Sequence, residues 1–203
     1  NTFTQETITV ELFADTLTNT EDLRNIPLDL VDTTNTILTI NDEVSFEDIK
    51  NSPLFSEQEY PSLELTQVAD SFDNIVQLEN SLLDGTTDVI LQNSTIQVID
   101  AINFENLQTI RNFTDNSIIV DKIIGSSTEL VEVSGFSDVI ISNSDITITD
   151  PIGYRDAVLI DSFNNLGGTV TIELVEDSFS NIVLLDGIET ISIDSSEILV
   201  TDS

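Results

Sequence analysis

The sequence predicts a β-dominated fold with short helices, arranged as a repetitive β/α solenoid. Three observations support this prediction: strand-like runs of β-branched residues recur along the 203 residues, many of them end in Asp, and a helix-start motif recurs between them. The helix starts lie roughly 27 residues apart on average. A segment of this size cannot bury its own apolar face, so stacked copies would share a core. A pair of Greek-key β-sandwiches is the alternative fold.

The strands are predicted from alternating Ile, Val, Leu and Thr residues. Residues 88–100 and 138–150 align without a gap, and each segment ends in Asp after such a run. Residues 36–42 and 197–202 end in the same way. The predicted strands are residues 8–12, 37–40, 63–68, 89–91, 96–99, 118–120, 130–133, 139–141, 146–148, 170–174, 190–193 and 198–200.

The helices are predicted from a motif of a small polar residue or Gly, an aromatic residue, any residue, Asn or Asp, and an aliphatic residue. The small residue is a typical N-cap, and the Asn or Asp three positions later occupies N3. Apolar residues follow at helical spacing, as in Phe72, Ile75 and Val76. A looser copy begins at Leu17. The aromatic residues predicted to begin helices and to stack in the core are Phe46, Phe72, Phe104, Phe136, Tyr154 and Phe179.

The repeat is most regular in residues 62–203. Residues 1–61 are therefore predicted to form an N-terminal arm and divergent first repeats. We expect both parts to be continuous, as one elongated domain.

The charge and composition exclude several classes of function. The chain has 38 acidic and 5 basic residues, which gives a net charge of −33. Nucleic acids and anionic membrane surfaces are therefore poor partners. The sequence has no apolar run approaching the ~18 residues of a spanning helix, so no membrane insertion is expected. The chain also lacks His and Cys, and no catalytic constellation is recognisable, so we expect a protein that is not an enzyme.

The aspartates at the strand ends are candidate metal ligands. In a stacked repeat they would form a row of like charges, and Ca2+ between them would relieve the repulsion. The loop of residues 84–88 is the best local candidate. The predicted Ca2+ ligands are Asp84, Asp88, Asp42, Asp100 and Asp150. The alternative role for such residues is capping and turn formation.

Residues 68–75 and 175–182 share the pattern Val-x-Asp-Ser-Phe-x-Asn-Ile, and strand-like Thr, Ile and Val residues follow each copy. This arrangement resembles the repeat modules of large secreted bacterial surface proteins, of the S-layer-like and RTX-associated adhesin types. The resemblance implies an extracellular structural role and transfers no catalytic residue. The calcium-binding nonapeptide Gly-Gly-x-Gly-x-Asp is absent from the sequence.

Two functions remain open from the sequence. The first is an extracellular structural protein that assembles with copies of itself into a surface layer or filament, modulated by divalent cations. Its contacts would be the apolar strand segments at residues 8–12 and 198–200, because unpaired strands are templates for further pairing. The alternative is a passive spacer module of a giant bacterial adhesin. Abundant acid and little Lys favour the cell surface of a marine bacterium.

Overall fold

The structure is a computed structural model, and it describes residues 8–9, 12–21, 31–32, 36–52, 62–80, 88–164 and 166–202. The described elements form a mixed α/β fold in which the strands pair in parallel. The chain divides into two compact units: residues 1–96 with 112–116, and residues 97–111 with 117–203. The boundary predicted after residue 61 rested on the regularity of the repeat, and it stays a prediction.

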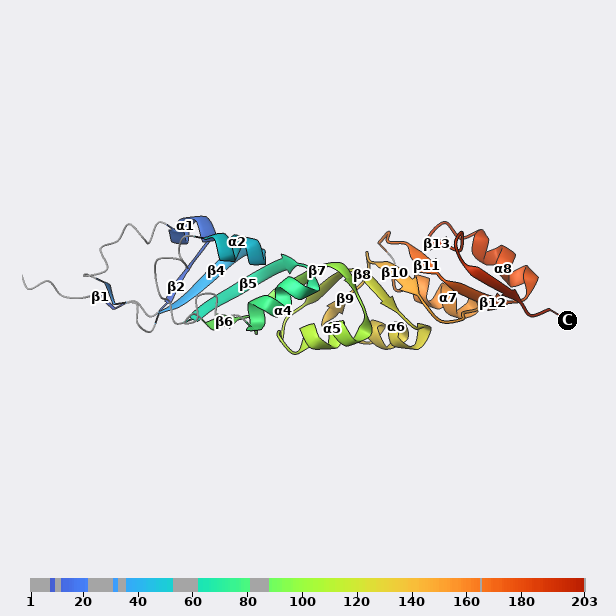
Figure 1. The fold of residues 1–203 in the computed structure, drawn as a ribbon, viewed down its shortest axis with the longest axis horizontal. Coiled ribbons are helices and arrows are strands. Elements are labelled where there is room, and N and C mark those ends of the chain that lie inside the picture. The colour runs from blue at the N-terminus through green and yellow to red at the C-terminus, as the bar shows by residue number, and fades with distance from the viewer. Residues whose placement is uncertain are drawn as a thin grey trace, which may run out of the picture. The chain divides into compact units, whose positions relative to one another are not determined.

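In the first unit, each described helix directly follows a strand (Figure 1). Strand β4 (Ile37–Val44) lies between β2 (Leu12–Asp15) and β5 (Ser62–Asp70), and β5 also pairs with β6 (Asp88–Ile90). A short pair joins β1 (Ile8–Thr9) to β3 (Val31–Asp32). The helices are α1 (Leu17–Glu21), α2 (Phe46–Asn51) and α4 (Phe72–Asn80).

The second unit has the same strand-then-helix order. Its main sheet contains β8 (Ile118–Gly125), β10 (Asp145–Ile148), β11 (Val170–Ile172) and β13 (Ile191–Ser192), and β9 (Val139–Ile140) pairs with β8. A separate pair joins β12 (Leu174–Asp177) to β14 (Glu197–Val200). Strand β7 (Thr95–Ile102) contains the boundary between the units. The helices are α5 (Phe104–Arg111), α6 (Ser127–Ser134), α7 (Tyr154–Asp161) and α8 (Phe179–Asp186).

The core is formed by one face of the strands and one face of the helices. Along β5, Leu63 and Leu65 are buried, whereas the residues on either side of each are more exposed. This is the alternation that a strand with one buried face requires. Helices α4 to α8 each add two buried residues one turn apart, such as Ile75 and Leu78 of α4.

Most of the predicted strands are confirmed, but residues 130–133 lie in helix α6. The reason is a capping box that the strand prediction overlooked. The Ser126 hydroxyl accepts a hydrogen bond from the Glu129 backbone N–H, and the Glu129 carboxylate accepts one from the Ser126 N–H. Leu130 and Val133, which alternation could not assign, are buried one turn apart.

Two further predicted strands differ in detail. Residues 170–174 are divided at Glu173 into β11 and the start of β12. Residues 8–12 contain β1 and the first residue of β2, and residues 10 and 11 lie outside the described part of the chain.

Helix starts are confirmed at five of the six predicted aromatic residues, and a further helix begins at Leu17. Phe136 is the exception, because it lies in the turn after α6. Its ring stacks on Phe104 with 6.2 Å between ring centroids, and the Arg111 guanidinium lies 3.8 Å from its centre. Arg111 also donates a hydrogen bond to Asp138 over 2.7 Å. In place of the predicted helix start, Phe136 therefore belongs to a cluster with Phe104 and the Arg111–Asp138 ion pair.

The prediction that the six aromatic residues form the core is wrong. Five of the rings are half-buried, and Phe179 is 65% exposed. The buried position lies three residues later, at Ile49, Ile75, Leu107, Ala157 and Ile182. The first residue of each helix lies at the helix end, whereas the residue three positions later faces the strands.

Candidate functional site

The strand-end aspartates bind the N-termini of helices that lie earlier in the chain. In the first unit, Asp42 accepts a hydrogen bond from the Leu17 N–H and Asp70 accepts one from the Phe46 N–H, both over 2.8 Å. In the second unit, three aspartates do the same for α6, α7 and α8, over 2.6 to 2.8 Å: Asp150 to Ser127, Asp177 to Tyr154 and Asp202 to Phe179. Donor and acceptor are 23 to 25 residues apart. The same contact therefore recurs in both units.

Two of these aspartates also bind the helix that follows their own strand. Asp70 accepts hydrogen bonds from the Ser71 N–H and from the Asn74 side-chain amide, both over 2.7 Å. Asp177 makes the equivalent pair of bonds to Ser178 and Asn181. One carboxylate thus links two successive helices, and the Asp-Ser-Phe-x-Asn pattern supplies all of the local partners.

In Asp177 these bonds favour the charged form of the carboxyl group. The Tyr154 backbone N–H, followed by the Asn181 amide and the Ser178 N–H, lowers the pKa of Asp177. Asp15 has the same local partners, and the Asn19 amide followed by the Thr16 N–H lowers its pKa.

A second contact recurs at serines that follow two-residue turns. The Ser94 hydroxyl donates to the Leu65 carbonyl in the first unit, and the Ser144 and Ser196 hydroxyls donate to the Val120 and Ile172 carbonyls in the second. Ser94 and Ser144 are completely buried. Sequence reasoning missed these serines, although Asn-Ser at residues 93–94 and 143–144 was a signal for them.

The predicted Ca2+ ligands have separate positions in the structure. Asp42 and Asp150 cap helices, Asp88 is exposed at the start of β6, Asp100 is half-buried in β7, and Asp84 lies outside the described residues. The described part of the chain contains no group of three or more carboxylates arranged to hold a metal ion. The sequence predicted cations beside Asp42 and Asp150. In the structure, these two carboxylates accept hydrogen bonds from backbone N–H groups instead.

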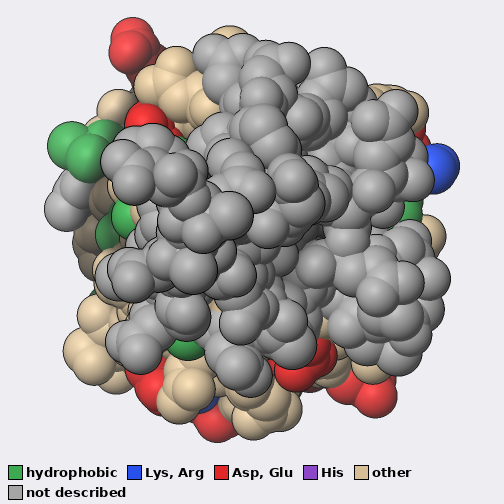
Figure 2. Space-filling view, turned by 90° about the vertical axis from the view of Figure 1, so that its left-hand side faces the viewer, with side chains coloured by type: hydrophobic (Ala, Val, Ile, Leu, Met, Phe, Trp, Pro, Cys, Tyr) green, Lys and Arg blue, Asp and Glu red, His purple; other side chains and the backbone are tan. Residues whose placement is uncertain are grey.

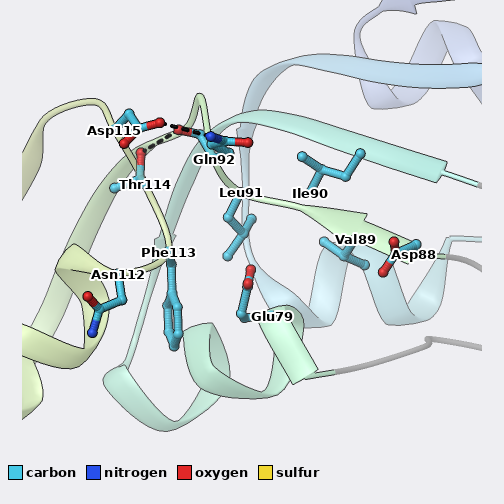
Figure 3. Close-up of a pocket in the computed structure, with 10 residues that line it drawn as sticks. All are labelled: Glu79, Asp88, Val89, Ile90, Leu91, Gln92, Asn112, Phe113, Thr114 and Asp115. Carbon is cyan, nitrogen blue, oxygen red and sulfur yellow. Dashed lines mark hydrogen bonds between the residues drawn. The ribbon is translucent and has the colours of Figure 1, made fainter.

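The first unit contains a polar pocket of about 330 Å³ (Figure 3). Glu79 at the end of α4, Asp88 of β6 and Asp115 supply carboxylates, and the half-buried Phe113 supplies an apolar ring. The pocket forms because the turn at residues 112–116 lies against the turn after β6. The Asp115 N–H donates to the Gln92 carbonyl over 2.8 Å, and the Gln92 side-chain amide donates to Asp115 over 3.0 Å.

Partial desolvation of its carboxylate, followed by the nearby charge of Asp88, raises the pKa of Glu79, although the residue as a whole is exposed. The described lining has carboxylates and amides but no Lys or Arg, so the pocket attracts cations in preference to anions. Sequence reasoning placed Asp88 in a candidate site. It missed Glu79 and Asp115, because only the fold brings these residues to Asp88.

The described surface has the acidity that the composition implies. Carboxylate side chains stand out around the rim of the view in Figure 2, whereas basic side chains are sparse. Among the described helices, none is long and apolar enough to cross a membrane.

Comparisons of the chain with known protein families, with curated proteins and with solved structures gave no match.

Proposed function

We propose that this chain is an extracellular structural repeat protein without enzymatic activity, which assembles with copies of itself into a surface layer or filament. The observation that carries the proposal is the recurrent aspartate cap. Five strand-end aspartates bind the N-termini of helices 23 to 25 residues earlier in the chain. A contact of this kind joins neighbouring segments of the chain. A protein built by stacking repeats needs such contacts at every junction, whereas an active site does not.

The repeated contacts support a β/α solenoid as the architecture. Parallel pairing, the aspartate caps and the buried serines each link a strand–helix segment to the one before it. In a solenoid each repeat contacts only its neighbours, so the same hydrogen bonds can recur at each interface between repeats. The alternative of Greek-key sandwiches has antiparallel sheets, which the parallel pairing disfavours.

Assembly needs a surface that can accept another copy. In the second unit, β14 pairs with β12 on one side, and Ile198, Leu199 and Val200 are about half exposed, at 48%, 52% and 47%. An exposed apolar edge strand is a template for pairing with another chain.

Divalent cations modulate the proposed assembly. A net charge of −33 makes copies repel one another, and Ca2+ would reduce this repulsion by binding or screening. The setting proposed with this function is the cell surface of a marine bacterium, where low Lys and high acid content suit saline water.

The second candidate function is a spacer module of a giant adhesin. The same stacking contacts would serve a rigid spacer equally well. Such a module differs in that it would be monomeric at all Ca2+ concentrations.

Size-exclusion chromatography with light scattering separates the two functions. The full chain is measured in Ca2+ and in EDTA with NaCl adjusted to equal ionic strength. Assembly predicts large, Ca2+-dependent particles, and a monomer under both conditions contradicts it.

A further inference from the structure

The exposed edge of the second unit continues a row of core residues. Ile152, Val175 and Ile198 are neighbours across successive parallel pairings. Ile152 is 3% exposed and Val175 is fully buried, but Ile198 is 48% exposed. Ile198 thus occupies a core position that has no strand beyond it among the described residues. Removing its apolar surface from water is favourable, so this edge gains from a further strand.

Helix α8 adds to the uncovered surface. Ile182 and Leu185 face the core, whereas Phe179, Val183 and Leu184 are 65%, 54% and 53% exposed. At the position equivalent to Val183, Val158 of α7 is only half exposed, and α7 packs beside α8. The exposed apolar surface of the second unit thus includes the edge of β14 and part of α8.

The first unit carries a complementary feature. Asp15 makes the same local bonds as Asp70 and Asp177, through its Oδ1 atom to the Thr16 N–H and the Asn19 amide. In Asp70 and Asp177 the Oδ2 atom caps an earlier helix. The Oδ2 atom of Asp15 accepts no hydrogen bond from the described residues. The outer edge of β2 thus offers a hydrogen-bond acceptor, the Oδ2 atom of Asp15. A strand that pairs with this edge would bring a backbone N–H donor to it.

We propose that β14 of one copy is joined by β2 of a second copy, in parallel. This proposal rests on the proposed function and names its interface. Parallel pairing is the arrangement found at β12 and β14, and it brings together two different edges. A contact between two β14 edges would be antiparallel and would leave Asp15 unused. Because a head-to-tail contact uses different surfaces on each copy, it does not close and can continue.

The pairing also indicates which residues meet. Asp177 lies beside Tyr154, two residues beyond the strand bridge at Ile152. By the same relation, Asp15 of the second copy would lie just beyond β14 of the first, near Asp202. The chain has no cysteine, so introduced thiols report this contact without background.

The first test compares two variants of the full chain by light scattering in Ca2+. Leu199→Lys places a charge on the edge strand, and the cross-strand neighbour of Leu199 is Glu176, so the monomer tolerates it. Leu166→Lys is the matched control, because Leu166 is 72% exposed and lies away from β14 in sequence and pairing. Leu199→Lys should raise the concentration needed for assembly about tenfold or more, because a charged edge resists pairing. The control should assemble like the unchanged chain.

The second test mixes equal amounts of Ala14→Cys and Thr201→Cys chains with a short bis-maleimide linker, and identifies the joined peptides by mass spectrometry. Both residues are exposed. The expected product joins residue 14 of one copy to residue 201 of another. Links only between two copies of residue 201 overturn the head-to-tail interface. Assembly that Leu199→Lys leaves unchanged also overturns it, while the proposed function survives. An unchanged chain that stays monomeric in Ca2+ overturns both.

Discussion

At the scale of single residues, Asp70 is the most buried of the capping aspartates. It is 7% exposed, and it binds the first N–H of α2 as well as two groups at the start of α4. Replacement by Ala would leave these donors without a partner. We expect Asp70→Ala to lower the free energy of unfolding by about 1–3 kcal/mol.

Chemical denaturation measures this loss, and Asp73→Ala is the control. Asp73 lies in the first turn of α4 but is exposed. Its loss should affect stability much less. Equal losses for the two variants would mean that Asp70 acts only through its charge near the helix end. Asp70→Asn, which keeps one acceptor oxygen, should fall between Asp70→Ala and the unchanged chain.

Glu79 should make a pH-dependent contribution of the opposite sign to that of Asp177. Its pKa is raised in the folded pocket, so the folded state binds the proton more tightly than the unfolded state. This contribution is fully present below the ordinary glutamate pKa of about 4.3, and it is lost as the pH rises through the folded pKa. Glu79→Gln should therefore raise the melting temperature at pH 7 and have little effect near pH 4.

The control for this measurement is Glu189→Gln, which removes one negative charge from an exposed turn. A rise of equal size in both variants would show that Glu79 acts only through the net charge. For Asp177 the folded pKa is lowered, so its contribution is present above the ordinary aspartate range and is lost as the pH falls through the folded pKa.

At the scale of the elements, the helices reverse the expected roles of their first and fourth residues. Ile75 is fully buried, whereas Phe72 is half-buried. Ile75→Ala should cost about 2–5 kcal/mol of stability, because it leaves a cavity in the core. Phe72→Ala should cost less, even though it removes the larger side chain. Denaturation of the two variants under the same conditions shows which one loses more stability. A larger loss for Phe72→Ala would support the original prediction that the aromatic residues form the core.

Element types were largely predictable because capping and alternation are local signals. Ser45 and Asp48 form the capping box that their spacing implied, and β5 alternates as expected. The failures occurred where two local signals competed. The apolar pattern of residues 130–133 is too short to distinguish a strand from one turn of helix. The capping box of Ser126 and Glu129 favours the helix. At Phe136 the helix-start motif is complete, but helix α6 ends directly before it. The residues after α6 form a turn, so no new helix begins there.

At the scale of the molecule, the partners of the strand-end aspartates could not be predicted from the sequence. The repeated Asp positions are visible in the sequence, and capping is one of the two roles that it predicts for them. That Asp177 caps the helix at Tyr154, and not only its own helix, depends on the register of parallel strands. The pocket depends in the same way on residues 92 and 115, which meet through non-local pairing. Both features follow from stacking, which acts between segments more than 20 residues apart.

The same stacking concentrates charge, and this sets the response of the whole molecule to salt. With 38 acidic and 5 basic residues, folding brings like charges closer together than they are in the unfolded chain. Screening shortens the range of this repulsion to about 10 Å at 0.1 M salt. The melting temperature should therefore rise with NaCl, by roughly 2–4 °C for each 1 kcal/mol gained in a chain of this length. Calorimetry from low to moderate salt measures this rise.

Ca2+ should raise the melting temperature further than NaCl of equal ionic strength, compared with EDTA. The capping aspartates already hold backbone N–H groups, so the added stability would come from carboxylates outside the caps, such as Glu79 and Asp88 at the pocket. The variant Glu79→Gln with Asp88→Asn should then lose part of the Ca2+-specific rise and keep the rise in NaCl. Equal melting curves in Ca2+ and in matched NaCl would leave screening as the whole effect. Divalent ions would then control assembly only by reducing the repulsion between copies.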